Sequence, residues 1–436
     1  MAVIEGSQGA TALVGMAGFV VGVQERVDGE WWLYVETRAD LVGCSTCGVR
    51  AVGHGRRLTT VRDLPIAGVP TVLVWAKRRW RCPEPLCSTT TWLESSPDIA
   101  PRASLTERAR RRIAEMVNVD GDSIAAAAAE FGVGWATANA AVAEYTDPRI
   151  DDSERLESVT AIGVDEKRFL NATPQRRTTF TTQIFDLDRN RLLDVVEGRS
   201  GDVLGDWLTE RGEAWCAGIT LATLDPAAGY RAAMRLHLPN AVRVVDHFHA
   251  VKLANKAIDD VRRRVQQDQL GHRGHKHDPL YRIRRALLVG CDRLTDERFE
   301  WIRSLLDVGD PDGEVGAAWL AKELLRAVYA AVDEAHARRR LIEFWQYCAE
   351  AEVPELTRLA ATMDRWQVEI LAYHRTGGAS NGRVENVHML AEKIRRNSHG
   401  FTNHTNYRRR LIGRLGLQWP TIPTRRIRGR QPHSIA

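Results

Sequence analysis

The sequence lacks any long apolar run. The longest, TALVGMAGFVVGV (11–23), is shorter than a bilayer span and is interrupted by glycines. The N-terminus also lacks the basic start and the small-residue cleavage site of a secretory signal. These absences exclude the patterns of an integral membrane protein and of a secreted one, and we expect a cytoplasmic, nucleoid-associated protein with no membrane partner.

Acidic residues are missing from two segments, although 44% hydrophobic and 27% charged residues over 436 positions are ordinary for a globular protein of two to four domains. From Lys393 to the C-terminus there are eleven Lys/Arg and no Asp or Glu. Between Cys47 and Cys82 there are eight Lys/Arg and only Asp63. Two separate basic zones indicate contact with a long polyanion such as double-stranded DNA, and solvated surface arginine is the alternative for either zone alone.

Cysteines are few, but four of the seven form two close pairs, C-x2-C and C-x4-C, thirty-four residues apart. Two thiolates on each of two tight turns complete a tetrahedral zinc site, whereas buried or redox-active thiols are the alternative. The four predicted ligands of a structural Zn²⁺ are Cys44, Cys47, Cys82 and Cys87. Alternating residues around a Val-Asp-Gly-Glu turn predict a β-hairpin over 19–38. Residues 1–98 are therefore expected to form a β-hairpin and zinc-ribbon DNA-binding domain.

Three short helices are predicted next, over 105–117, 123–133 and 135–145, in a domain spanning 99–146. Ala128, Gly132 and Ala138 have the spacing of a helix-turn-helix, in which a small residue lies at the helix crossing and a glycine makes the turn. An alanine-rich helical hairpin is the alternative, but nearby arginines favour DNA binding. The residues predicted to contact DNA here are Arg108, Arg111, Trp135, Thr137 and Asn139.

A polar linker over 147–158 leads to an α/β pattern. Three strands in succession (158–169, 178–188, 191–199) are followed by a helix, a strand (219–225), a helix and a strand (241–246), which is the order of a ribonuclease-H-like fold. We expect its first part at 159–249, an all-helical insertion at 250–376, a C-terminal catalytic helix in 377–412 and a basic tail at 413–436.

Two acids fall at neighbouring strands of this predicted sheet. Asp165 interrupts an apolar strand, and Asp225 ends the fourth strand, directly before Pro226. Either aspartate alone has a simpler explanation, since Asp225 can cap the following helix. Together they favour a metal site, because an unpaired buried charge is costly and a cation offsets that cost.

Long blocks of the chain resemble a known family. IGVDEKRF, TLDPAAGYRAAMRLHLPNAVRVVDHFHAVKLAN, GHRGHKHDPLYRIRRALL and SNGRVENVHMLAEKIRRNSHGF, with the cysteine pairs and the helix-turn-helix before them, are similar to DDE-type transposases of bacterial insertion sequences, specifically the ISL-three family. The resemblance implies that Asp165, Asp225 and Glu385 are the catalytic acids and hold Mg²⁺ or Mn²⁺. It also implies that Asp246 and His249, a D-x2-H element, support that site.

The resemblance further implies binding to terminal inverted repeats, metal-dependent DNA cleavage and strand transfer, carried out by a homodimer on DNA. Arg395 and Arg396 would hold phosphates beside Glu385. One departure from the family is that Asn386, Val387 and His388 replace a small residue and an Asn-rich helix. The alternatives are a transposase-derived repressor that binds DNA without cutting it, and a nuclease of the same fold.

Overall fold

The computed structural model describes residues 8–38 and 41–420 and divides the chain into two compact units. The first unit comprises residues 1–155, 393–400 and 405–436, and the second comprises 156–392 and 401–404. Most of the predicted basic tail (413–436), from 421 onward, lies outside the described residues. The two-unit division is coarser than the predicted domain boundaries, which stay predictions.

The first unit begins with a β-rich region, as predicted. Its sheet has the order β1-β2-β4-β3, and β5 pairs with β4. Phe19 and Trp75 pack edge to face in its core, with ring centroids 5.4 Å apart. The elements are α1 (Gln8–Val14), β1 (Phe19–Val27), β2 (Glu30–Thr37), β3 (Val52–Ile66), β4 (Val69–Arg81) and β5 (Thr91–Leu93).

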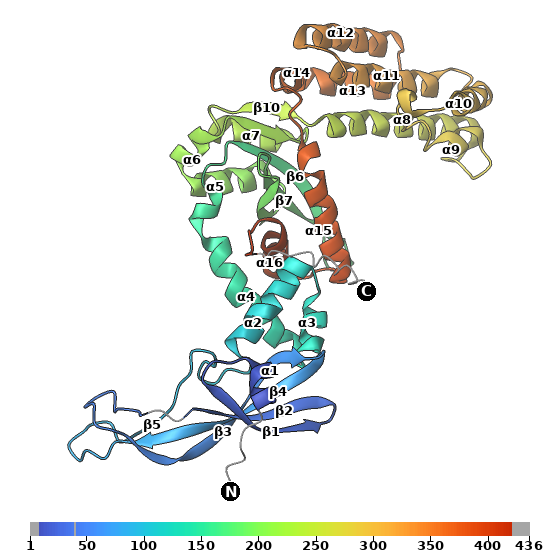
Figure 1. The fold of residues 1–436 in the computed structure, drawn as a ribbon. Helices are drawn as coiled ribbons and strands as arrows, with labels where there is room; N and C mark the ends of the chain where they lie inside the picture. Colours follow the sequence, from blue (N-terminus) through green and yellow to red (C-terminus); the bar gives the residue numbers. More distant parts are fainter. Residues whose placement is uncertain (1–7, 39–40, 421–436) are drawn as a thin grey trace, which may run out of the picture. The chain divides into compact units, whose positions relative to one another are not determined.

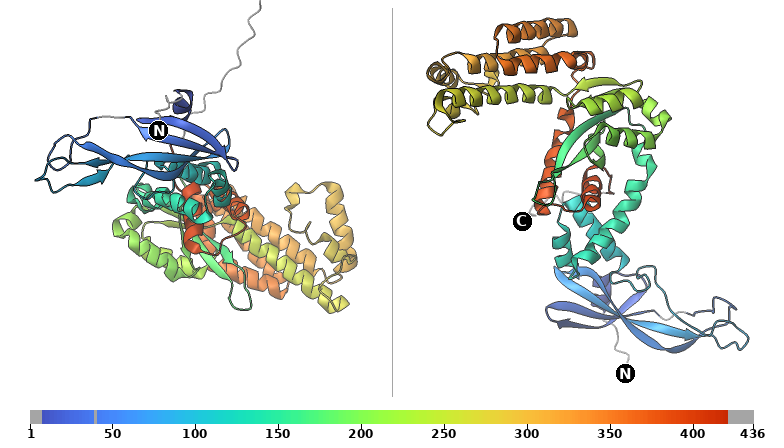
Figure 2. Two further views of the ribbon diagram at one scale, coloured as in Figure 1. Left: turned by 90° about the horizontal axis from the view of Figure 1, so that it is seen from below. Right: turned by 180° about the vertical axis from the view of Figure 1, so that it is seen from behind.

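Strands β3 and β4 form a long antiparallel ribbon. Figures 1 and 2 show this ribbon running beyond β1 and β2 toward the loops around β5. The part of β3 from Val52 to Leu58 is exposed, whereas β4 from Thr71 to Trp75 is buried. The ribbon therefore has a buried half in the body of the sheet and an exposed half near the cysteine pairs.

A separate small core holds the helices of the first unit together. They are α2 (Glu107–Glu115), the π-helical turn η1 (Met116–Asp120), α3 (Ile124–Glu130) and α4 (Trp135–Asp151). The 3-10 turn η2 (Ser153–Leu156) follows, and its Leu156 belongs to the core of the second unit. Thr106 and Ser123 cap α2 and α3 with their hydroxyl oxygens. Gly132, with φ of +62°, makes the turn between α3 and α4. The DNA-reading role of this pair of helices stays a prediction.

Helix α16 (His404–Leu415) is part of the first unit from Thr405 onward, and the expectation that residues up to 412 belong to the catalytic core stays a prediction. Arg410 is buried and donates to the carbonyls of Val117 (2.6 Å) and Asp122 (2.8 Å). Carbonyls at the end of a helical turn lack intrahelical partners and attract cations. Arg410 supplies hydrogen bonds to these carbonyls, so its guanidinium serves the packing of the first unit.

The second unit has a five-stranded mixed sheet in the order β10-β9-β6-β7-β8. Strands β6, β7 and β8 are antiparallel neighbours, and β9 and β10 run parallel to β6. Their bounds are β6 (Ala161–Leu170), β7 (Thr179–Asp186), β8 (Arg191–Glu197), β9 (Leu221–Leu224) and β10 (Val242–Val245). This topology is consistent with the predicted ribonuclease-H-like core.

Helices connect the later strands and form the predicted insertion. Helices α8 to α14 extend from the β10 edge of the sheet, as both views show (Figures 1 and 2), and share one core with it. The elements are α5 (Gly201–Arg211), α6 (Glu213–Gly218), α7 (Ala228–His237), α8 (His247–Leu270), α9 (Pro279–Ile283), η3 (Cys291–Arg293), α10 (Asp296–Gly309), α11 (Glu314–Tyr329), α12 (Glu334–Glu350), α13 (Pro354–Arg365) and α14 (Gln367–Arg375).

The chain returns to the sheet through the 3-10 turn η4 (Asn381–Val384) and helix α15 (Glu385–Asn397). Up to Glu392, α15 belongs to the second unit. Across residues 8–38 and 41–420, no helix is long and apolar enough to cross a membrane.

Candidate active site and metal centre

The parallel register of the sheet brings the predicted aspartates together. Val164 on β6 pairs with Leu224 on β9, so the next residues, Asp165 and Asp225, lie side by side. Leu224 also pairs with Val245 on β10, which places Asp246 at the same edge. Three carboxylates therefore lie on adjacent parallel strands, with Asp165 within β6 and Asp225 and Asp246 directly after β9 and β10.

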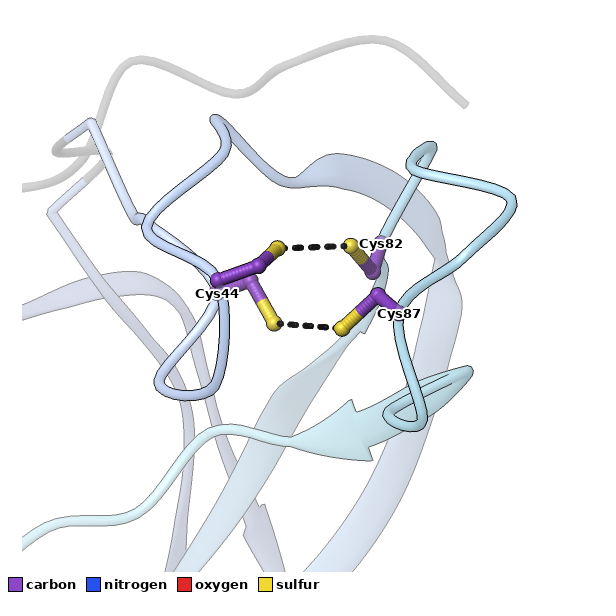
Figure 3. Close-up of side chains that lie close together, drawn as sticks. Cys44, Cys82 and Cys87 are labelled. Atoms are coloured by element: carbon purple, nitrogen blue, oxygen red, sulfur yellow. Dashed lines mark hydrogen bonds between the residues drawn. The ribbon is translucent and has the colours of Figure 1, made fainter.

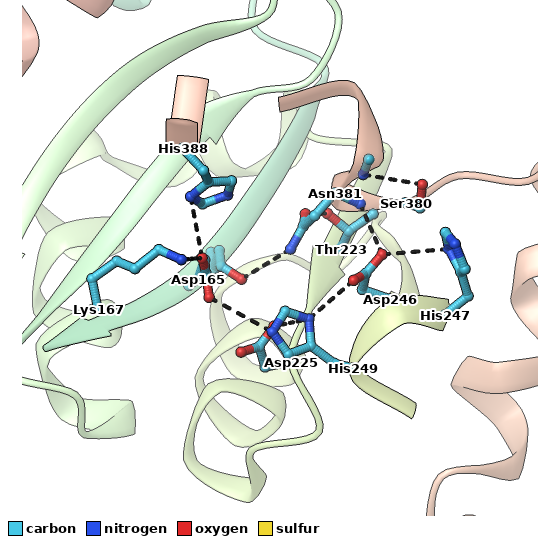
Figure 4. Close-up of polar contacts among 12 residues, drawn as sticks. Asp165, Lys167, Thr223, Asp225, Asp246, His247, His249, Ser380, Asn381 and His388 are labelled. Carbon is cyan, nitrogen blue, oxygen red and sulfur yellow. Dashed lines mark hydrogen bonds and ion pairs between the residues drawn. The ribbon is translucent and has the colours of Figure 1, made fainter. Parts of the chain in front are cut away.

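Asp165, Asp225 and His249 form a group in which one ligand atom from each residue lies within 4.8 Å of the others. Figure 4 shows this group with His249 reaching it from the first turn of α8. Asp165 is only 3% exposed. Such a concentration of buried negative charge requires cations nearby.

Lys167 supplies one of these cations. Its Nζ lies 3.0 Å from Asp165 Oδ2, and the two residues share a face of β6 because they are two positions apart. Burial alone would raise the pKa of Asp165, but Lys167 and the nearby histidines outweigh it and hold the pKa below its usual value. Asp165 is therefore ionised at neutral pH.

His249 supplies the second cation. Its Nδ1 lies 3.0 Å from Asp246 Oδ2, in hydrogen-bonding geometry, and 2.8 Å from Asp225 Oδ1, at an angle that does not suit a hydrogen bond. Burial opposes protonation, but the contacts with Asp225 and Asp246 prevail and raise the pKa of His249 to about 9. Burial and the charge of Asp165 raise the pKa of Asp225 to about 6, against the opposing effect of His249.

Asp246 ties the site to the C-terminal segment. It is buried, and its Oδ1 accepts a hydrogen bond from the backbone N–H of Asn381 at 3.2 Å, while its Oδ2 faces His249. Asp246 thus orients the imidazole of His249 through Nδ1. The supporting role of the D-x2-H element in catalysis stays a prediction.

The donor set suits a hard divalent ion. Asp225 Oδ1 is buried and has no hydrogen bond. Carboxylate oxygens are the ligands that Mg²⁺ and Mn²⁺ prefer, and an ion would satisfy this oxygen while neutralising the paired aspartates. The acidic cluster is therefore compatible with a divalent metal at a catalytic site.

Glu385, the third predicted acid, is not part of this group. It is exposed at the first turn of α15, and its carboxylate is outside the set of mutually close ligand atoms found in the described chain. A third carboxylate would add repulsion to a site whose two aspartates are already neutralised by Lys167 and His249. The role of Glu385 stays a prediction.

Three other side chains at this site were not expected from the sequence. The first is Lys167, described above. The second is His388, whose Nδ1 lies 3.3 Å from Asp165 Oδ2, and the third is the buried Asn381. Burial lowers the pKa of His388 to about 4, against the charge of Asp165, so its imidazole is neutral at pH 7. Lys167 could have been predicted, because residues two positions apart on a strand share a face. His388 and Asn381 could not, because they reach the site only through the tertiary fold.

The four paired cysteines converge as predicted. Cys44 Sγ lies 3.7 Å from Cys87 Sγ, and Cys47 Sγ lies 3.5 Å from Cys82 Sγ (Figure 3). All four sulfurs lie within 4.8 Å of one another. With Zn–S bonds of about 2.3 Å, a tetrahedral site needs sulfurs somewhat less than 4 Å apart. The cluster therefore indicates a structural zinc site.

The predicted DNA contacts of the first unit fall into two groups. Arg108 makes an ion pair with both oxygens of the buried Asp63 and donates to the Val14 carbonyl at 2.6 Å. That guanidinium holds α2 against β3 and leaves little to offer a phosphate. Arg111, in contrast, is exposed and pairs with Glu115, one turn along its helix.

The start of α4 exposes the remaining candidates to different degrees. Trp135 is 49% exposed, whereas Thr137 and Asn139 are half-buried. On α15, Arg396 is exposed and Arg395 is half-buried. Trp135, Arg111 and Arg396 thus present the most accessible surface among these candidates.

Comparison with known proteins identifies related chains. Residues 162–411 match the ISL3 family of DDE transposases, described as "Transposase", and residues 40–87 match the family described as "zinc-finger of transposase IS204/IS1001/IS1096/IS1165". Two curated proteins from two strains of Mycobacterium tuberculosis, each a "Transposase for insertion sequence element IS1557", are 26% identical over 316 residues, which cover 67% of this chain and 68% of theirs.

The match over residues 162–411 spans more than half of the chain and includes the strands that carry Asp165 and Asp225. The zinc-finger match includes all four paired cysteines. The protein therefore belongs to the ISL3 family of DDE transposases and is a transposase of an insertion sequence.

Proposed function

We propose that this transposase binds the terminal inverted repeats of its own element and catalyses metal-dependent cleavage and strand transfer with Asp165, Asp225 and Glu385. The observation that carries this proposal is the side-by-side placement of the buried Asp165 within β6 and the half-buried Asp225 directly after β9. Bare carboxylates would repel a phosphodiester, so a site of this kind serves DNA chemistry only when cations are bound between acid and phosphate.

Asp165 and Asp225 would hold the divalent ions, and Glu385 would join them once the ions and DNA have neutralised the site. Ions bound there would offset the charge that grows on the phosphate as one oxygen attacks and another departs. Asp246 keeps His249 oriented toward Asp225. Lys167 keeps Asp165 ionised and therefore ready to coordinate.

DNA binding would involve the zinc ribbon, the helices α3 and α4, and the basic residues of α15. The exposed surface of Trp135 at the N-terminus of α4 supports the assignment of α4 as the recognition helix. We further propose that a homodimer joins two element ends, and that the protein acts on the nucleoid in the cytoplasm.

A second candidate is a transposase-derived repressor that binds the ends without cutting them. The position of Glu385 outside the acid cluster favours this reading, because strand cleavage in the proposed scheme needs a third carboxylate. The two functions differ only in chemistry, so a cleavage assay separates them.

The experiment uses purified full-length protein, a labelled duplex that carries one end of the element, and Mg²⁺. We expect wild-type protein to nick at the end of the repeat. Asp165→Asn, Asp225→Asn and Glu385→Gln should each reduce nicking by at least about a thousandfold while end binding in a gel-shift assay changes less than about twofold. Wild-type protein that binds the ends and never nicks them would establish the repressor instead.

A further inference from the structure

Asn381 is a buried amide at the edge of the sheet where the acids meet. It is 6% exposed and is the first residue of η4, four residues before Glu385. Figure 4 shows it reaching from the C-terminal segment toward the strands that carry Asp165 and Asp225. Because a buried amide is costly unless it is hydrogen-bonded, its partners indicate what it holds in place.

Asn381 has a hydrogen-bond partner on β6, another on β9 and a third directly after β10. Its Oδ1 accepts a hydrogen bond from Thr223 Oγ1 of β9, and its Nδ2 donates a long hydrogen bond of 3.5 Å to the Val164 carbonyl of β6. Its backbone N–H donates to Asp246 Oδ1, just after β10, at 3.2 Å. The Val164 carbonyl can only accept, so the amide has one chemically sensible orientation.

These partners are next to the acids in sequence. Val164 precedes Asp165 directly, and Thr223 lies two positions before Asp225. A shift of Asn381 would therefore move the C-terminal segment relative to both aspartates at once.

The sheet makes room for this side chain at Gly163. A Cβ added at Gly163 would lie 2.6 Å from Asn381 Oδ1, 2.9 Å from Leu187 Cδ2 and 3.1 Å from Thr223 Oγ1. Any side chain on β6 at this position would thus push the amide out of its slot. The Asn381 amide therefore occupies space that is available only because residue 163 is glycine.

We infer that Asn381 is a positioning residue, whose side chain locks the start of α15 between β6 and β9 and so anchors the segment from which Glu385 joins Asp165 and Asp225 when ions and DNA are bound. His388, three residues after Glu385, contacts Asp165 as well, so the helix is held on both sides of the predicted third acid. This inference rests on the proposed function, because it assigns Asn381 a role that acts through Glu385.

The test compares full-length variants by Mn²⁺ binding in the presence of the element-end duplex, followed by electron paramagnetic resonance, and by cleavage of that duplex. Asn381→Ala should lower Mn²⁺ affinity about tenfold and cleavage about a hundredfold, since a misplacement of about 1 Å has an effect of this size. End binding should stay within about twofold of wild type, and the melting temperature should fall by no more than a few degrees. Thr223→Val, which removes one hydrogen bond at nearly constant volume, should produce a smaller change in the same direction.

Asn240→Ala is the matched control. Asn240 is exposed, and its Nδ2 donates to the Ala217 carbonyl at 2.9 Å, before the start of β10 and away from the acids. Asn240→Ala thus removes a hydrogen bond from a side-chain amide to a backbone carbonyl in the same unit. We expect wild-type Mn²⁺ binding and cleavage from this variant.

A double variant separates positioning from general stability. In the Glu385→Gln background, Asn381→Ala should cause no further loss of Mn²⁺ affinity, because the residue through which it acts is already gone. Additive losses, or an Asn381→Ala variant with wild-type Mn²⁺ binding and cleavage, would overturn the inference while leaving the proposed function intact. If Glu385→Gln itself cuts like wild type, the proposed third acid fails, and the inference fails with it.

Discussion

The surroundings of Asp165 show how single residues stabilise a buried carboxylate. Its carboxylate is 3% exposed and has Lys167 at 3.0 Å, while His388 at 3.3 Å is neutral at pH 7 because burial lowers its pKa to about 4. Lys167 is therefore the closest full positive charge to Asp165. Removing one partner of a buried ion pair leaves the other charge uncompensated, which is strongly destabilising.

Lys167→Met should accordingly destabilise the second unit when no divalent ion is present. We expect a loss of about 1–3 kcal/mol, less than for a fully buried pair because Lys167 is partly exposed. Millimolar Mn²⁺ should reduce the difference in stability between Lys167→Met and wild type, since the ion supplies the missing positive charge. Hydrogen exchange of the β6 and β9 amides, with and without Mn²⁺, measures both effects.

The matched control is Lys256→Met, which removes an exposed ion pair with Asp260 on α8. Its effect should stay below about 1 kcal/mol and should not depend on Mn²⁺. The account of Asp165 is contradicted if the β6 and β9 amides of Lys167→Met exchange as slowly as those of wild type, both with and without Mn²⁺.

At the scale of the element, the β3–β4 ribbon contains like charges whose repulsion a bound polyanion would neutralise. Arg57 pairs with Lys77 across the ribbon, and Arg79 and Arg81 follow Lys77 on the same face. Like charges opposite one another destabilise a β-ladder. Arg57, Arg79 and Arg81 are exposed and form no ion pair with any residue in 8–38 or 41–420. This half of the ribbon is therefore suited to phosphate contacts.

Replacing Arg57, Arg79 and Arg81 together by Gln should weaken end binding at all salt concentrations tested. Each lost phosphate contact lowers the magnitude of the slope of log affinity against log salt by about 0.9, so the slope should fall by up to about 3. A salt series of gel-shift or anisotropy measurements gives this number directly.

The control removes an equal charge from the helical insertion by replacing its exposed Arg298, Arg303 and Arg339 with Gln. We expect a slope close to that of wild type from this control. A ribbon variant whose slope equals that of the control would show that the ribbon does not contact DNA.

Over the whole molecule, local patterns in the sequence predicted what depends on a single strand or turn. The five strands of the second unit and the two cysteine pairs follow from apolar runs and close spacings. The neighbouring positions of Asp165 and Asp225 follow from the topology of the predicted fold. The Asn381 contacts and the burial of Arg410 depend on segments more than a hundred residues apart in the chain. No periodicity encodes such contacts, so they could not be predicted.

The position of Glu385 was also beyond the reach of sequence reasoning, for an electrostatic reason. The resemblance implies a ligand of a bound ion, but a third carboxylate gains nothing at a site already neutralised by Lys167 and His249.

The most direct test of the central claim, that these acids hold a divalent ion that supports DNA cleavage, is the metal preference of Asp225→Cys in the element-end cleavage assay. A thiolate is a poor ligand for Mg²⁺ and a better one for softer ions. The account predicts that this variant cuts at least about a hundredfold more slowly than wild type in Mg²⁺ and recovers substantially in Mn²⁺. Cleavage by Asp225→Cys at the wild-type rate in Mg²⁺ would contradict it.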